Sequence, residues 1–305
     1  MSSHPKKQHY VPQFYLKKFR VNQNEPAESG TQIWCYDKKQ RKSYRSGIRE
    51  IVQQVGFYDY TNPATGETVS IEKNLSQLES KFKVVLDRVL SARQLPTDYR
   101  ARRDLARFIA YQSFRTLGTR ELLRQIGTIE AQLFGEDPSC FPPLQANELA
   151  LSHIRVIGEF SESLIPMLLE KKWVLLYNRS TSSLWLSDSP VTLRNRHIFP
   201  GRGNLGFGVP GVEVYIPLSP RLTLLLCDKE ERMSETGGFM DTAQIDFLNR
   251  LQGFYARRFV LSCDPDFGAL GEMLEAFPAA HDPQRPMFNM NNPGGRMSRS
   301  TDGAS

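Results

Sequence analysis

The sequence contains few cysteines and none of the spacings that make a zinc or redox motif. Its four cysteines are Cys35, Cys140, Cys227 and Cys263. They lie far apart and no CxxC occurs, which argues against a zinc knuckle or a thioredoxin-type centre. Free thiols in a reducing compartment fit this spacing better than a disulfide framework does.

Long hydrophobic runs are also lacking. The longest aliphatic run lies near Leu222–Leu226, far short of the roughly 20 apolar residues that a membrane-spanning helix needs. No apolar stretch that could serve as a signal peptide precedes His4. We therefore expect a cytoplasmic protein that does not cross or bind a membrane.

Several catalytic motifs are missing as well. The sequence has no GxSxG, HExxH or GxxxxGK[ST], so it gives no support to a serine hydrolase, a zincin or a P-loop enzyme. Gly201–Gly206 reads GRGNLG, but it follows a proline and leads into a strand, whereas the dinucleotide fingerprint needs a helix there. The identity of any bound metal stays unknown.

What the sequence does have is a mild and uneven excess of positive charge. The formal net charge is +6 over 305 residues, which permits an anionic partner without requiring one. Residues 1–50 contain eleven lysines and arginines against four acidic residues. The segment Tyr99–Gln125 contains seven arginines against two acidic residues.

The hydrophobic pattern predicts a hairpin, then helices, then strands. Residues 32–45 place aromatic residues on both sides of a charged turn, which is typical of a β-hairpin. Apolar residues at spacings of three and four predict helices over 75–89, 98–116, 120–134 and 144–170, with Gly118 ending the second. From residue 172 on, short β-rich runs are interrupted by one helix over 241–256.

This order predicts an α+β fold in which a helical layer packs on a mostly antiparallel β-sheet. No clear linker divides the chain, so we expect a single α+β domain over residues 1–276. Residues 277–305 lack periodicity and are rich in Pro, Gly, Asn and Ser, which predicts a disordered tail.

A few polar residues stand where a plain core would not place them. Gln112 and Arg115 continue the apolar stripe of the second helix, and Asn249 stands in the stripe of the last one. His9 and Gln13 lie among aromatic residues near the N-terminus. Each of these residues either makes an internal hydrogen bond or lines a pocket, and the pattern leaves both interpretations open.

The segment WLSDSPV places Ser187 and Asp188 directly after an expected strand. Strand ends are common positions for catalytic carboxylates, because a rigid strand positions the side chain. An Asp-Ser-Pro turn that caps the strand explains the same residues equally well.

The charged turn of the hairpin is the candidate anion-binding segment. Lysines and arginines flanked by Tyr36 and Tyr44 can contact a phosphate backbone and stack on bases. The same residues are also typical of an ordinary turn whose charges discourage edge-to-edge pairing. The residues of this candidate site are Lys38, Lys39, Arg41 and Lys42.

Five segments, taken in order, resemble one family, the domain of unknown function 4238, which is found mainly in bacteria. They read QHYVPQFYLKKF, FIAYQSFRTLGTR, WLSDSPV, YIPLSPRLTLLL and FLNRLQGFYARRFV. The resemblance extends over about residues 7–263 and implies no activity. The chain departs from the family pattern at Gln13, where many relatives have a basic residue, and at Ser189, where asparagine is frequent. The polar positions that match the family pattern are His9, Pro12, Gln112, Arg115, Ser187, Asp188, Pro190 and Asn249.

Three hypotheses follow. The first is an enzyme, a phosphoesterase or nuclease in a defence or toxin setting, that acts on nucleic acid or a phosphorylated small molecule. In it His9 is the general acid or base, Asp188 holds a divalent metal or orients a nucleophile, and Arg115 contacts phosphate. Gln112 orients the substrate, with Gln13, Ser187 and Asn249 as further binding residues. The second is a non-catalytic module that binds nucleic acid or another anion through one continuous positive face, formed by the basic hairpin and the arginine-rich helix. The third is a protein-interaction scaffold.

Overall fold

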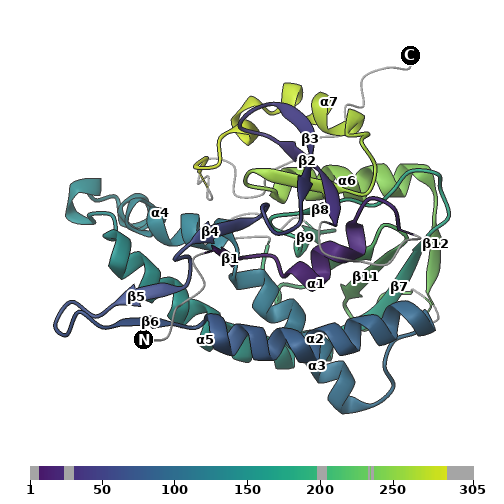
Figure 1. Cartoon of the computed structure of the whole chain (residues 1–305), viewed down its shortest axis with the longest axis horizontal. Helices are drawn as coiled ribbons and strands as arrows, with labels where there is room; N and C mark the ends of the chain where they lie inside the picture. The colour runs from purple at the N-terminus through teal and green to yellow at the C-terminus, as the bar shows by residue number, and fades with distance from the viewer. Residues whose placement is uncertain (1–6, 24–30, 198–204, 233, 235–236, 287–305) are drawn as a thin grey trace.

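The computed structural model describes residues 7–23, 31–197, 205–232, 234 and 237–286. It is a mixed α+β structure in which α2, α3 and α5 form a helical layer along one side, and a hairpin and α7 lie on the other (Figure 1). The helices are α1 (Gln13–Leu16), α2 (Glu72–Ala92), α3 (Tyr99–Phe114), α4 (Leu117–Phe134), α5 (Ala146–Glu170), α6 (Thr242–Tyr255) and α7 (Gly268–Ala276).

The strands form two larger sheets and two short ladders. The strands are β1 (Lys7–His9), β2 (Gln32–Asp37), β3 (Lys42–Gly47), β4 (Gln53–Val55), β5 (Asp59–Thr61), β6 (Thr68–Ser70), β7 (Lys172–Asn178), β8 (Leu186–Ser187), β9 (Thr192–Asn195), β10 (Val212–Ser219), β11 (Leu222–Cys227), β12 (Gly238–Met240) and β13 (Phe259–Ser262). The sheet orders are β12-β7-β11-β10-β9 and β3-β2-β13-β8, with β1-β4 and β5-β6 as separate pairs. The β12–β7 pair is parallel and the other described pairs are antiparallel. The α+β class and the mostly antiparallel pairing are confirmed.

The predicted helices are present, with one boundary explained differently. Asp98 caps α3 by accepting the backbone N–H of Ala101 at 2.8 Å, as its position suggested. The break after α3 comes at Arg115 and Thr116, and Thr116 is the N-cap of α4. Gly118 is therefore not the helix breaker. It lies inside α4, where an added Cβ would come within 3.5 Å of the Ser189 hydroxyl.

The N-terminal segment is anchored by its aromatic residues. Tyr15 and Phe19 have no exposed surface, and the rings of Tyr15 and Phe108 make an edge contact at 5.2 Å between centroids. The Tyr15 hydroxyl also donates to the Pro217 carbonyl on β10. Burial of such rings contributes a few kcal/mol, roughly 1.5–3 for each side chain. The segment therefore belongs to the core and is not a loose tail.

The predicted start of the disordered tail, residue 277, is too early in the sequence, because residues 277–286 pack against the rest of the protein. Pro278–His281 forms a 3-10 helix, and Ala280 is 3% exposed. Arg285 donates from Nη2 to the Phe254 and Ala256 carbonyls, at 2.7 and 3.0 Å. These carbonyls end α6, where a cation is favourable. The rest of the predicted tail, 287–305, lies outside the described residues.

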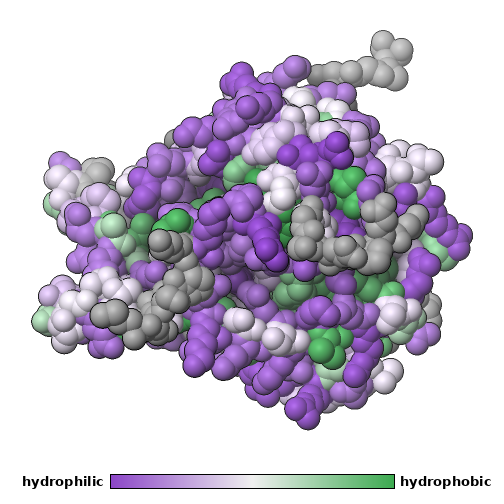
Figure 2. All heavy atoms as spheres, in the orientation of Figure 1, coloured by the Kyte–Doolittle hydropathy of each residue, from purple (hydrophilic) through white to green (hydrophobic). Residues whose placement is uncertain are grey.

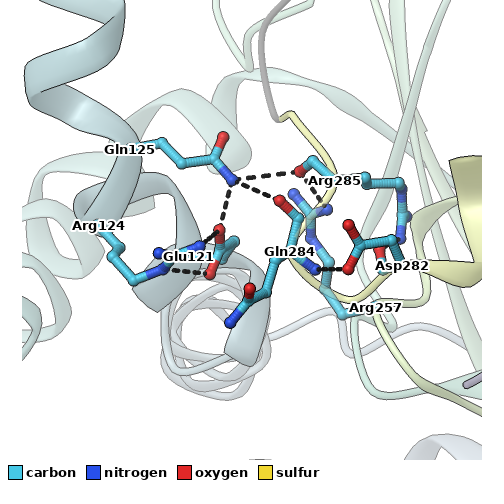
Figure 3. A network of polar contacts seen from close by, with 7 residues as sticks. All are labelled: Glu121, Arg124, Gln125, Arg257, Asp282, Gln284 and Arg285. Atoms are coloured by element: carbon cyan, nitrogen blue, oxygen red, sulfur yellow. Dashed lines mark hydrogen bonds and ion pairs between the residues drawn. The ribbon is translucent and has the colours of Figure 1, made fainter. Parts of the chain in front are cut away.

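The same segment is also fastened to α4 (Figure 3). The Gln125 side chain donates to the backbone carbonyls of Gln284 and Arg285, at 3.0 and 3.2 Å. Arg257 donates to the Arg285 carbonyl at 3.1 Å. Periodicity could not reveal this segment, because it is held by polar contacts to distant elements and not by an apolar stripe of its own.

The face in Figure 2 is covered mostly by hydrophilic side chains, and hydrophobic ones form separate small patches. No helix in the described part of the chain is long and apolar enough to cross a bilayer.

Candidate functional site

Three of the four proposed catalytic residues meet at one place, and the fourth makes its contacts elsewhere. Gln112 and Arg115 both donate to the backbone of β1 and the residue that follows it, at Tyr10 and His9. Asp188 instead binds the backbone between α6 and β13. The three residues converge because α3 ends against the N-terminal segment.

Arg115 is the centre of this cluster. Its side chain is 2% exposed. Nη1 donates to Glu79 on α2 at 2.7 Å, and Nη2 donates to the His9 carbonyl at 2.7 Å. Nε donates to the Tyr58 hydroxyl at 3.2 Å. Burial opposes the charge of Arg115, but Tyr58 and Glu79 outweigh it and raise its pKa. The guanidinium is therefore occupied within the protein and not presented to a phosphate.

Gln112 makes one internal bond and leaves one atom unpaired. Nε2 donates to the Tyr10 carbonyl at 3.1 Å. Oε1 is buried without a hydrogen-bond partner among the described residues. The side chain thus secures the N-terminal segment to α3, at a site that is not fully satisfied.

His9 presents a neutral imidazole. Its Nε2 lies 3.3 Å from the Ile48 carbonyl, and because a carbonyl only accepts, Nε2 carries the proton. Burial lowers the pKa of His9, although the Ile48 carbonyl and Glu79 oppose the shift. The lowered pKa favours the uncharged form of the ring.

Glu72 is a site residue that the sequence reasoning missed. It stands two turns before Glu79 on α2, so both carboxylates share the apolar stripe that contains Leu75. Its Oε2 is buried without a partner in the described part of the chain. Burial raises the pKa of Glu72 to about 7; Arg115 opposes the rise, and Glu79 and Asp59 add to it. The sequence feature that could have identified Glu72 is the presence of carboxylates within an apolar helical stripe.

Asp188 has a structural role in this fold. It has no exposed surface. Its carboxylate accepts the backbone N–H groups of Arg257, Arg258 and Phe259, at 2.8, 2.7 and 2.9 Å. Burial raises the pKa of Asp188, and these three amides oppose the rise. These bonds join Asp188 to a distant segment and are not the local Asx turn that the sequence suggested; the local turn bond runs from the Ser189 N–H to the Ser187 hydroxyl oxygen, at 3.2 Å.

The neighbouring polar residues connect the same segments. Asn249 accepts the Trp185 N–H at 2.8 Å and donates to the Ser183 carbonyl at 2.9 Å. The Ser187 hydroxyl donates to Gln252 at 2.7 Å, and Gln252 donates to the Pro190 carbonyl at 2.9 Å. These bonds hold the strand β8 and its turn against α6. Gln13 begins α1 and is half-buried.

Lys38 does not belong to the basic surface that the hairpin presents. It is fully buried, and Nζ donates to the Gly253 and Ala256 carbonyls at 2.8 and 2.7 Å. Burial lowers the pKa of Lys38 to about 7, with Arg285 adding to the shift. The prediction of Lys38 as an anion-binding residue is not supported by this placement, because its ammonium caps the C-terminal end of α6.

The other hairpin cations are exposed. Lys39, Arg41 and Lys42 lie at the tip and at the start of β3. The hairpin and the arginine-rich α3 lie on opposite sides of the molecule in Figure 1. The second hypothesis had combined them in one continuous positive face, and the arrangement of the elements does not support that part of it.

The described residues contain no group of three or more His, Cys, Asp or Glu side chains placed to hold a metal ion. Asp188, the proposed metal ligand, has both carboxylate oxygens engaged by backbone amides.

Comparison with known proteins identifies a family and no relative of known function. The family model described as "Protein of unknown function (DUF4238)" matches residues 7–266. No curated protein and no solved structure matches the chain.

Replacing Arg115 should destabilise the protein strongly. We expect Arg115→Ala to lower the free energy of unfolding by about 3–5 kcal/mol, because it leaves Glu79 and two backbone or hydroxyl acceptors without their donor. Arg103 on the same helix is exposed and makes no ion pair with a described carboxylate, so Arg103→Ala should cost less than about 0.5 kcal/mol. Urea unfolding of both variants measures the difference, and equal costs would refute the central role of Arg115.

Asp188→Asn should be destabilising by about 3 kcal/mol or more, because an amide cannot accept three backbone N–H groups and turns a donor toward them. The adjacent Ser189 provides the control. Its hydroxyl is buried without a partner among the described residues, so Ser189→Ala should change stability by less than about 0.5 kcal/mol. A normally stable Asp188→Asn protein would show that the carboxylate serves some purpose other than holding the backbone.

Glu72 should make stability depend on pH. Its pKa in the folded state is raised from 4.5 to about 7, so its contribution is complete below about pH 4.5 and is lost as the pH rises toward 7. Glu72→Gln should therefore raise the Tm at pH 8 and leave it nearly unchanged at pH 4. Glu67, an exposed carboxylate, is the control, and Glu67→Gln should have no such pH-dependent effect.

Proposed function

The chain belongs to the DUF4238 family, whose description assigns no function, and we propose that this member is a non-catalytic module that binds nucleic acid through the basic β2–β3 hairpin. One observation carries the proposal. The exposed cations of this hairpin and of the turn after it make no ion pair with a carboxylate in the described part of the chain. They are Lys39, Arg41, Lys42, Arg45 and Arg49.

The contrast with cations that pair with carboxylates supports this choice. Arg115 pairs with Glu79, Lys171 with Asp228 and Arg258 with Asp37. These charges are neutralised by partners within the protein, whereas those of the hairpin remain available. Unpaired cations on a surface attract a polyanion and release its counterions on binding.

The hairpin is also rigid and includes aromatic rings. Six residues of β2 pair with β3, and β13 pairs with the other edge of β2. The Arg45 guanidinium lies 5.5 Å from the centre of the Trp34 ring, and the Lys42 ammonium lies 6.0 Å from the Tyr44 ring. Proteins that bind single-stranded nucleic acid combine cations with aromatic faces in this way.

Lys38 contributes to this surface indirectly. Its two bonds to the end of α6 and the bond from His281 to its carbonyl, at 2.9 Å, fix the base of the turn. The neighbouring exposed cations are therefore presented from a fixed backbone. Preorganisation of this kind lowers the entropy cost of binding.

The contacts favour binding over the enzyme hypothesis. The arginine and the carboxylate that the enzyme would use, Arg115 and Asp188, are engaged in internal bonds. A substrate phosphate would have to displace Glu79 from Arg115.

Removal of three hairpin charges tests the proposal. We expect the variant Lys39→Ala, Arg41→Ala, Lys42→Ala to bind a fluorescent 20-mer of single-stranded DNA at least tenfold more weakly at 100 mM salt. The slope of log affinity against log salt should become shallower by about 2, since each lost phosphate contact removes about 0.7. Fluorescence anisotropy between 50 and 300 mM salt measures both quantities.

The control removes the same charge elsewhere. Lys73, Lys81 and Arg155 are exposed on α2 and α5, and their triple alanine variant should keep most of the affinity. Equal losses in the two variants would mean that net charge alone matters, and no binding by the wild-type protein to single-stranded DNA or RNA would refute the proposal.

A further inference from the structure

A second basic site lies away from the hairpin, where α2 ends beside β7 and the β10–β11 turn. A pocket of about 340 Å³ opens there, a volume near the lower end of known ligand pockets. Two of its lining side chains are arginines and none is acidic. The lining residues are Leu90, Arg93, Asn178, Ser219, Arg221 and Leu222.

Arg93 is held in an unusual backbone conformation. It is the C-cap of α2 with φ of 52°, in the left-handed region where glycine is the usual residue. The Tyr177 hydroxyl donates to its carbonyl at 2.6 Å, and its guanidinium lies 5.3 Å from the centre of the Tyr177 ring. The side chain makes no ion pair with a described carboxylate. A glycine would cap the helix with less strain, so the arginine stands at this position at a conformational cost.

Arg221 is tethered on one side and open on the other. Its backbone N–H donates to the Ser219 hydroxyl oxygen at 3.2 Å. Nη1 donates to the Ser180 carbonyl and lies 3.4 Å from that of Ser182. Nε and Nη2 make no hydrogen bond with the described residues. The fixed guanidinium therefore keeps two donors available.

Cations and aromatic rings alternate beside the pocket. The ring centroids of Tyr177 and Phe239 lie 5.8 Å apart, and the Arg179 guanidinium lies over the Phe239 ring. Phe239 is 58% exposed. The last carbonyls of α2 carry about half a negative charge in total, which two full guanidinium charges outweigh.

We propose that this pocket binds the phosphate group of a small phosphorylated molecule through Arg93 and Arg221. One planar guanidinium group can bind two oxygens of a phosphate at once. Two guanidinium groups that line one pocket therefore match a phosphomonoester better than they match a single carboxylate. The Ser219 hydroxyl has a proton to donate to the same group. This site does not depend on nucleic-acid binding by the hairpin.

Calorimetric titration of the full chain with adenosine monophosphate, ribose 5-phosphate and adenosine tests the proposal. We expect the two phosphomonoesters to bind and adenosine not to bind. Arg93→Gly and Arg221→Ala should each weaken phosphomonoester binding at least tenfold. Arg100, an exposed arginine on α3 that does not line the pocket, is the control, and Arg100→Ala should leave the Kd unchanged.

The choice of Arg93→Gly keeps the test independent of folding. Glycine adopts the left-handed cap without strain, so this variant should melt at the same temperature as wild type or higher. The hairpin triple variant should still bind phosphomonoesters, which separates this site from the proposed function. Absence of binding at 10 mM ligand, or binding that both arginine variants retain, would overturn the inference.

Discussion

The arrangement of the N-terminal half depends on one buried guanidinium. Arg115 stands where α3 ends, and its donors reach Glu79 on α2, the carbonyl of His9 in β1 and the hydroxyl of Tyr58. Burying this charge is costly unless every donor finds a partner. The need for those partners specifies how α2, α3 and β1 meet, and apolar packing alone would leave their relative position less defined.

A second polar frame organises the C-terminal half on the same principle. Asp188 accepts three consecutive backbone amides before and at the start of β13, while Asn249 and Gln252 reach from α6 to the β8 segment. Each bond joins parts of the chain more than 60 residues apart. The motifs that resemble a catalytic constellation in the sequence therefore coincide with the frame that holds the two sheets and α6 together.

Much of the fold could be predicted because its helices have clear apolar stripes and Asp98 and Asp241 mark their starts. What could not be predicted depends on partners distant in sequence. Lys38 looks like any other lysine of a charged turn until the end of α6 is placed beside it. Residues 277–286 have no periodicity, yet Arg285 and Gln125 anchor them. Glu72 was hidden because a helical pattern does not reveal which carboxylate will lack a partner.

The charge of this protein also has to be considered by location and not as a total. A net charge of +6 says little, because several cations are engaged inside the fold, as Lys38, Arg115 and Arg285 are. The cations free to meet a ligand are those that the fold leaves unpaired. In the described chain they include the cations of the β2–β3 hairpin and those of the pocket of Arg93 and Arg221, beside others spread over α2, α3 and α5. Aromatic rings lie beside the cations at both places. Because an anion competes with internal carboxylates for every cation, recognition is expected where that competition is absent.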